Sequence, residues 1–173
     1  MDAILLIVIG VGLTTFLLRL ESWPSKRLAG PFPAGDTAWA MSEENVEIVR
    51  EGYERFAATG EVVADLATDD FVWDMSNFHG WPEQQVYEGV EGTGAFLRAW
   101  MEAWEDWELE VEALHDAGDK VVAIVHQHGR SKAAGMPVEM HFAQVWTLRD
   151  GKQSRMDMYS DRAEALEAVG LSE

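Results

Sequence analysis

The amino-acid sequence predicts an α+β fold, in which a curved antiparallel sheet is packed by three N-terminal helices and encloses a cavity like a cone. Three observations support this class. Helical periodicity dominates the first part of the folded region, and strictly alternating segments such as residues 107–113 dominate the second part. The turn at residues 149–152 also has Asp-Gly at its centre, which is typical of a hairpin.

The helical part is predicted from apolar residues that recur every three or four positions. The first helix is expected to start after Ser42, a suitable N-cap, and to end at Gly60, a suitable C-terminal cap. A short helical piece is expected near residues 61–67, and a third helix from Thr93. Their apolar positions are Val46, Val49, Tyr53 and Phe56 in the first helix, and Phe96, Leu97, Trp100, Met101 and Trp104 in the third.

The strands are predicted from alternation and from the turns between them. In residues 107–113, Trp, Leu and Val alternate with three glutamates, which is the pattern of a half-buried strand. Residues 76–92, rich in Gly, Pro and aromatic residues, are predicted to be a loop, and Asp161 is predicted to cap a last short helix that ends at Gly170. The expected strands are residues 71–75, 107–113, 121–130, 137–148 and 153–159.

Residues 1–40 differ from the predicted domain, residues 41–173. Residues 3–18 carry no charge, and at about 1.5 Å per residue they would form a helix of about 24 Å, short of the ~30 Å hydrocarbon core. Two interpretations remain open. The segment is a weak membrane anchor, with the domain in the cytoplasm because basic residues follow the run, or it is upstream sequence from a mis-assigned start. A membrane is therefore expected as a partner only if residues 3–18 insert.

The composition excludes several functions. The chain has 13 basic and 31 acidic residues and a formal charge of -18, which repels phosphate backbones and argues against nucleic acid as a partner. It contains no cysteine, which excludes disulfides and fits a cytoplasmic location. The sequence has no phosphate-binding Gly loop, nucleophile elbow or zinc-ligand spacing, so we expect no cofactor. The eight tryptophans and eight methionines either fill the core or line a cavity for an apolar ligand.

Several motifs resemble the nuclear transport factor 2-like superfamily, in particular the SnoaL-like proteins. They are 42-SEENVEIVREGYERFAATGE-61, 67-ATDDFVWDM-75, 80-GWPEQQVYEGVEG-92, 144-QVWTLRDGK-152 and 157-DMYSDRAEALEAVGL-171. The resemblance implies a cystatin-like roll and a pocket for a small apolar molecule. It implies either a cofactor-free isomerase, dehydratase or cyclase that acts by proton transfer, or a non-catalytic module for ligand binding or dimerisation. It also implies a homodimer that pairs through the outer face of the sheet.

The resemblance to ketosteroid isomerases suggests catalytic roles for three residues. Tyr53 stands seven residues before Gly60, as the first-helix tyrosine of the isomerases does. Asp74 follows an Asp-Asp pair one residue closer than their general base does, and Gln144 stands where they have a protonated Asp. This implies that Asp74 is the base and that Tyr53 and Gln144 stabilise oxyanion charge.

Two alternatives stand beside this interpretation of Asp74. It is a strand-end residue hydrogen-bonded in a turn, and it points away from the cavity if the face of Phe71, Trp73 and Met75 is core. The base would then be His126, which resembles the His that scytalone dehydratase pairs with Asp. His126 shares a face with His128, and the resemblance implies that this face lines the cavity. The pair can anchor a metal, but no third ligand is evident, so no metal site is predicted.

The remaining predicted ligand-binding residues are aromatic or apolar. Trp81 and Tyr87 form the cavity lid or only pack the loop around them. Gln144 and Trp146 share one face of their strand, whereas His141 has the opposite parity and is expected outside the cavity or at an interface. The full predicted ligand-binding set is Trp73, Trp81, Tyr87, His128, Gln144, Trp146 and Met156.

Overall fold

The computed structural model describes residues 36–79 and 85–172, with side chains from Ser42 onward. Six strands and the helices that cover them follow one another along the chain. The elements are α1 (Asp36–Thr59), the 3-10 turn η1 (Ala64–Leu66), β1 (Ala67–Asn77), β2 (Val86–Glu88), α2 (Gly89–Glu102), β3 (Trp104–Asp116), β4 (Lys120–Ser131), β5 (Pro137–Arg149), β6 (Lys152–Tyr159) and α3 (Arg162–Ala168).

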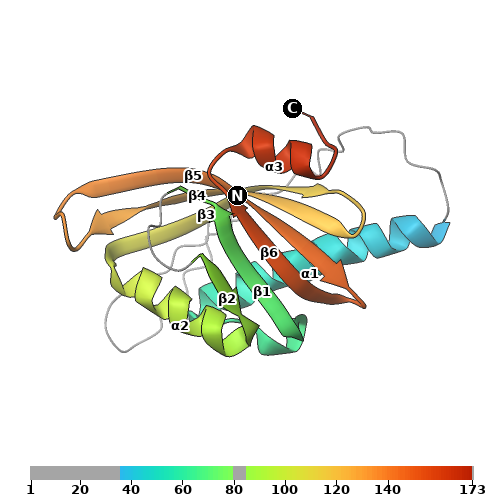
Figure 1. The fold of residues 1–173 in the computed structure, drawn as a ribbon, viewed down its shortest axis with the longest axis horizontal. Coiled ribbons are helices and arrows are strands. Elements are labelled where there is room, and N and C mark those ends of the chain that lie inside the picture. The colour runs from blue at the N-terminus through green and yellow to red at the C-terminus, as the bar shows by residue number, and fades with distance from the viewer. Residues whose placement is uncertain (1–35, 80–84, 173) are drawn as a thin grey trace, which may run out of the picture.

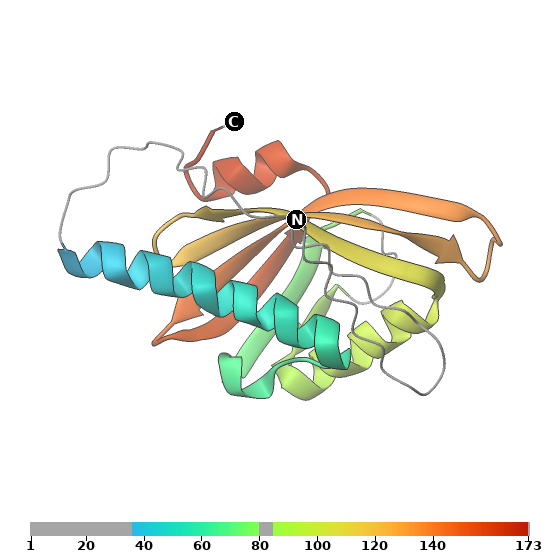
Figure 2. The same ribbon diagram turned by 180° about the vertical axis from the view of Figure 1, so that it is seen from behind.

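The strands form one curved sheet in the order β2-β1-β6-β5-β4-β3. Helices α1 and α2 lie across one face, and α3 lies on the other (Figures 1 and 2). The predicted α+β class is confirmed, but the sheet is mixed, because β1 pairs with β6 in parallel. No hairpin connects these two strands, since β2, α2 and three further strands intervene in the sequence, and so no turn makes them antiparallel.

Turn chemistry explains where several elements end. Asp150 and Gly151 have φ angles of 54° and 71°, the left-handed pair that a type I′ hairpin requires, and they join β5 to β6 as predicted. Gly60, with φ 71°, ends α1 and donates its N–H to the carbonyl of Phe56. The predicted N-cap role of Ser42 is wrong. α1 already begins at Asp36, and the Ser42 hydroxyl donates to the carboxylate of Asp116.

The segment predicted as a loop contains an edge strand and the start of a helix. β2 and the first turn of α2 fall within residues 86–92, where three residues of strand are too few to show an alternating pattern. The predicted boundary at Met41 lies inside α1. Residues 3–18 lie outside the described residues, and no helix within residues 36–79 and 85–172 has the length and apolarity needed to cross a membrane.

Two apolar clusters hold the fold together, one on each face of the sheet. The larger lies between the sheet and helices α1 and α2 and is rich in aromatic rings. The smaller lies under α3, where Leu166 is completely buried against Val122, Ile124 and Val145. Because helices cover both faces at this point, residues 121–125 of β4 are all buried, and β4 does not alternate there.

Candidate functional site

A cavity of about 80 Å³ lies inside the larger cluster, between the inner face of the sheet and helices α1 and α2. No side chain that lines it is charged at neutral pH. Aromatic rings make up much of the wall, with polar groups at a few positions. The lining residues are Val49, Gly52, Tyr53, Phe56, Val62, Val63, Phe71, Trp73, Met75, Phe96, Leu97, Trp100, Trp107, Leu109, Gln127, Phe142, Gln144, Trp146, Gln153 and Met158.

One wall of the cavity carries a buried hydrogen-bond chain from α1 to β5. The hydroxyl of Tyr53 donates to Oε1 of Gln144 and accepts from Nε1 of Trp146 at 3.1 Å. Burial raises the pKa of Tyr53 far above its ordinary value, although the hydrogen bond from Trp146 opposes the shift. Tyr53 is therefore a neutral phenol whose single proton is already engaged, and it cannot act as a tyrosinate base near neutral pH.

The cavity is also lined by a glutamine that the sequence patterns did not single out. Gln127 on β4 is 1% exposed, and its Oε1 accepts from Nε1 of Trp100 at 3.1 Å. An indole N–H only donates, so this bond fixes the amide with its oxygen toward Trp100 and its NH₂ group away from it. Nε2 of Gln127 is buried without a hydrogen-bond partner, as is Nε1 of Trp73. Buried polar atoms nearly always have partners, so these donors mark positions where a ligand can bind.

Asp74 lies on the outer face of β1, away from the cavity. Its neighbours Phe71, Trp73 and Met75 line the cavity, so alternation turns the carboxylate outward. Partial burial alone would raise its pKa, but hydrogen bonds from Ser76 and the charge of Arg155 outweigh burial and lower the pKa. The Asp74 carboxylate accepts from the backbone N–H of Ser76 at 2.8 Å and from Arg155 at 2.5 Å. This environment suits a structural ion pair rather than a general base.

His126 and His128 also lie outside the cavity. They share a face, as predicted, but the expectation that this face lines the cavity is wrong. The inner face of β4 carries Val121, Ala123, Val125 and Gln127 instead. A His126–Asp74 dyad in the cavity is therefore excluded by geometry. His141 pairs directly with His126 across β4 and β5, which places it on the outer face as expected.

The other predicted ligand-binding residues divide between the cavity wall and its surroundings. Trp73, Gln144 and Trp146 line the cavity with Tyr53. Met156 is completely buried in the surrounding core. Tyr87 stacks on Phe96 with ring centroids 4.3 Å apart, behind the cavity wall. Trp81 lies outside the described residues.

Residues 49–156, more than half of the chain, match the family model of the SnoaL-like domain. A putative SnoaL-like polyketide cyclase from Jannaschia sp. CCS1 is among the similar solved structures. It is 20% identical with a TM-score of 0.58, and the match covers 83% of this chain and 100% of that chain.

Two further solved structures share the architecture. TerC, co-crystallised with polyporic acid, is 21% identical with a TM-score of 0.56, over 73% of this chain and 98% of its own. An NTF2-like protein from Burkholderia thailandensis E264 is 24% identical with a TM-score of 0.56, over 70% of this chain and 95% of its own. At these identities the likeness shows the fold alone. No curated protein matches the sequence.

Proposed function

Because the chain belongs to the family of SnoaL-like domains, we propose that it binds a small, largely apolar molecule with a carbonyl oxygen in the cavity under α1 and α2. The observation that carries this proposal is the uncharged, aromatic cavity with unsatisfied hydrogen-bond donors among its lining residues. Ligand sites of this kind combine an apolar lining with a few fixed polar groups that orient the ligand.

The donors determine which ligands fit best. The NH₂ group of Gln127 and the indole N–H of Trp73 both need acceptors, and neither can accept a hydrogen bond there. A carbonyl oxygen supplies an acceptor without bringing a charge into the cavity. An anionic ligand would meet no cationic side chain among the lining residues. A neutral ketone or quinone is therefore favoured over a carboxylate.

The size of the cavity limits the ligand. At about 80 Å³ it is smaller than the roughly 300–1,000 Å³ of sites for drug-sized molecules. The ligand is therefore either a small ring or a larger molecule that displaces lining side chains such as Leu97 or Phe56. We take the small ring as the test case.

Proton transfer, the catalytic alternative predicted from the sequence, now lacks a base. Asp74 and His126 are on the outer face, and within residues 42–79 and 85–172 no lining side chain can accept a proton at neutral pH. The Tyr53 hydroxyl can donate to developing oxyanion charge only if it gives up its bond to Gln144, and this donor is what still favours an isomerase, dehydratase or cyclase. Our proposal is accordingly a binding function.

Two molecules of the same shape test the proposal. Cyclohexanone and methylenecyclohexane differ in whether the ring carries an oxygen or a CH₂ group. We expect cyclohexanone to bind more tightly by roughly 2- to 13-fold, which corresponds to one hydrogen bond of about 0.5–1.5 kcal/mol. In ¹⁵N NMR spectra, cyclohexanone should shift the side-chain signals of Gln127 and Trp73.

The variant Gln127→Met should reduce this preference, leaving only the part due to the indole N–H of Trp73. Gln153→Met is the matched control, because Gln153 also lines the cavity but its Nε2 already donates to the carbonyl of Ile48. The proposal fails if neither molecule binds at millimolar concentration, or if Gln127→Met keeps the full preference. Deuterium exchange next to the carbonyl in D₂O, lost in Tyr53→Phe, would instead favour the proton-transfer enzyme.

We also propose that the chain forms a homodimer, as predicted from the resemblance. On the outer face, α3 covers only one part of β4 and β5 (Figures 1 and 2). The strands beyond α3 are available to a second copy of the chain.

A further inference from the structure

The outer face of the sheet gathers histidines and glutamates in two rows across β3, β4 and β5. Cross-strand pairing places Glu110 beside His126 and His126 beside His141 in one row. The next row joins Glu108, His128 and Glu139. No role in the cavity explains this arrangement, because alternation points all six side chains away from it.

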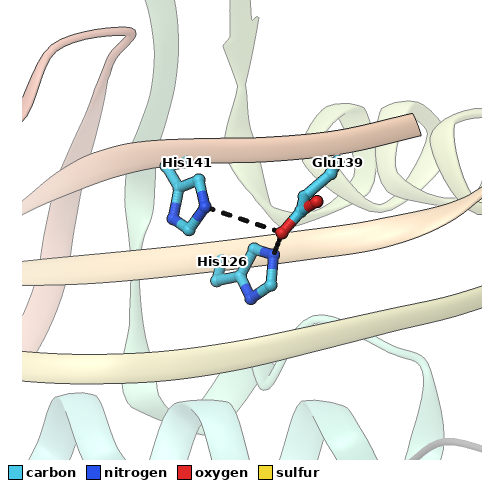
Figure 3. Close-up of side chains that lie close together, drawn as sticks. All are labelled: His126, Glu139 and His141. Atoms are coloured by element: carbon cyan, nitrogen blue, oxygen red, sulfur yellow. Dashed lines mark ion pairs between the residues drawn. The ribbon is translucent and has the colours of Figure 1, made fainter.

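Three of these side chains converge on one point. The ligand atoms of His126, Glu139 and His141 lie within 4.8 Å of one another. Nε2 of His126 is 2.9 Å and Nε2 of His141 is 3.9 Å from the same carboxylate oxygen of Glu139 (Figure 3). Two neutral imidazoles and a carboxylate are a common ligand set for Zn²⁺ and related ions.

The distances fit a metal ion between these atoms. With metal–ligand bonds of about 2.0–2.1 Å and tetrahedral angles, neighbouring ligand atoms lie about 3.3 Å apart. The two N···O distances of 2.9 and 3.9 Å bracket this value. The rings of His126 and His141 are stacked, with an interplanar angle of 3°, so their in-plane lone pairs run parallel, and both side chains must rotate before these lone pairs converge on one ion.

The opposite nitrogens of both rings face further carboxylates. Nδ1 of His126 is 3.9 Å from Glu110, and Nδ1 of His141 is 3.7 Å from Glu112. Metal-binding histidines usually present one nitrogen to the metal and the other to a carboxylate or carbonyl, which orients the ring and raises its basicity. Here both histidines have their second carboxylate from the same strand, β3.

Charge and unsatisfied atoms favour a cation at this point. Nε2 of His126 is buried and has no hydrogen bond, although a carboxylate oxygen of Glu139 is 2.9 Å from it. Among the described residues, no lysine or arginine forms an ion pair with Glu108, Glu110, Glu112 or Glu139. A bound cation would supply the missing positive charge in a chain of formal charge -18.

We propose that His126, Glu139 and His141 bind a divalent transition-metal ion, Zn²⁺ in the first instance, on the outer face of the sheet. Glu110 and Glu112 orient the two imidazoles. In the single chain water completes the coordination, because Glu139 and His141 are largely exposed. Mg²⁺ and Ca²⁺ fit poorly, since both prefer oxygen ligands. The sequence pattern showed only His126 and His128, of which His126 alone is a ligand here, whereas the other two ligands, Glu139 and His141, come from the neighbouring strand β5.

The test is a zinc titration of the full chain after treatment with a chelator. We expect one Zn²⁺ per chain, and at least tenfold weaker binding in His141→Ala and in Glu139→Gln. Both side chains are more than half exposed, so these variants should fold. Glu112→Gln should weaken binding by roughly 10- to 100-fold, as expected when a group that orients a ligand is lost.

His79→Ala and Glu105→Gln are matched controls, since each removes an exposed residue of the same type away from the cluster. They should keep the affinity within threefold. Co²⁺ substitution gives a second measurement, because an ordered site with nitrogen ligands has visible absorption bands that His141→Ala should remove. The proposal is overturned if the wild-type chain binds no zinc in the titration, or if His79→Ala weakens binding as much as His141→Ala does.

Discussion

Replacing Tyr53 by Phe should destabilise the domain through the groups that lose their partner. The substitution deletes one hydroxyl and leaves Oε1 of Gln144 and Nε1 of Trp146 without their hydrogen bonds. All three side chains are at most 8% exposed, so bulk water does not replace the lost partner. Each orphaned buried group costs roughly 1–3 kcal/mol, which gives a range of about 2–6 kcal/mol.

Water in the cavity should reduce this loss of stability. Its volume of about 80 Å³ exceeds the ~10–15 Å³ that one water needs, and such a water can bond to both orphaned groups. We therefore expect a loss of about 2 kcal/mol in the free energy of unfolding. For a domain of this size that loss lowers Tm by roughly 6–10 °C.

A double-variant cycle tests whether the lost hydrogen bond between Tyr53 and Gln144 causes the destabilisation. Gln144→Leu removes the acceptor of the Tyr53 hydroxyl. When Tyr53→Phe is combined with Gln144→Leu, no side-chain carbonyl of Gln144 is left without a hydrogen bond. Tyr53→Phe should therefore cost less in the Gln144→Leu background, with a coupling of about 1 kcal/mol. Phe56→Leu, on the same helix and cavity wall but without a polar atom, is the control and should show no coupling to Gln144.

The measurement is urea denaturation at pH 7, followed by circular dichroism, of the four proteins of the cycle and of Phe56→Leu alone and combined with Gln144→Leu. A loss below about 0.5 kcal/mol for Tyr53→Phe, or additive losses in the cycle, would show that the hydrogen-bond chain is not a structural unit. The cavity wall would then be looser than its geometry indicates.

Two further predictions concern the outer face. The pKa of Asp74 is lower in the folded state than its unfolded value of about 3.9. Its ion pair with Arg155 therefore stabilises the fold at pH values above about 3.9. This stabilisation is lost as the pH falls through the folded pKa of Asp74. In urea denaturation, Asp74→Asn should lower the free energy of unfolding by about 1 kcal/mol at pH 7 and by little at pH 3. An equal loss at both pH values would contradict the ion-pair role. Sedimentation at micromolar concentration should show a homodimer, and a clean monomer would remove the outer face as an interface.

Much of the fold follows from local patterns in the sequence. The alternation in residues 107–113 and the Asp-Gly turn at residues 150–151 predict β3 and the β5–β6 hairpin, because side-chain period and turn conformation are local properties. Parity also established that His126 shares a face with His128, and that Gln144 shares one with Trp146. These relations depend only on the strand conformation of the residues themselves and are independent of how the rest of the chain packs.

Which face is inside was decided only by the tertiary structure. Residues 121–125 of β4 are apolar throughout, because α3 covers one face while α1 and α2 cover the other, so no alternation distinguished the two. The resemblance suggested that His126 faced the cavity, but Gln127 does. A shift of one residue exchanges the faces of a strand, and only the packing of distant helices determines which side becomes the core. The register of the β4–β5 pair, rather than helix packing, places Glu139 and His141 beside His126.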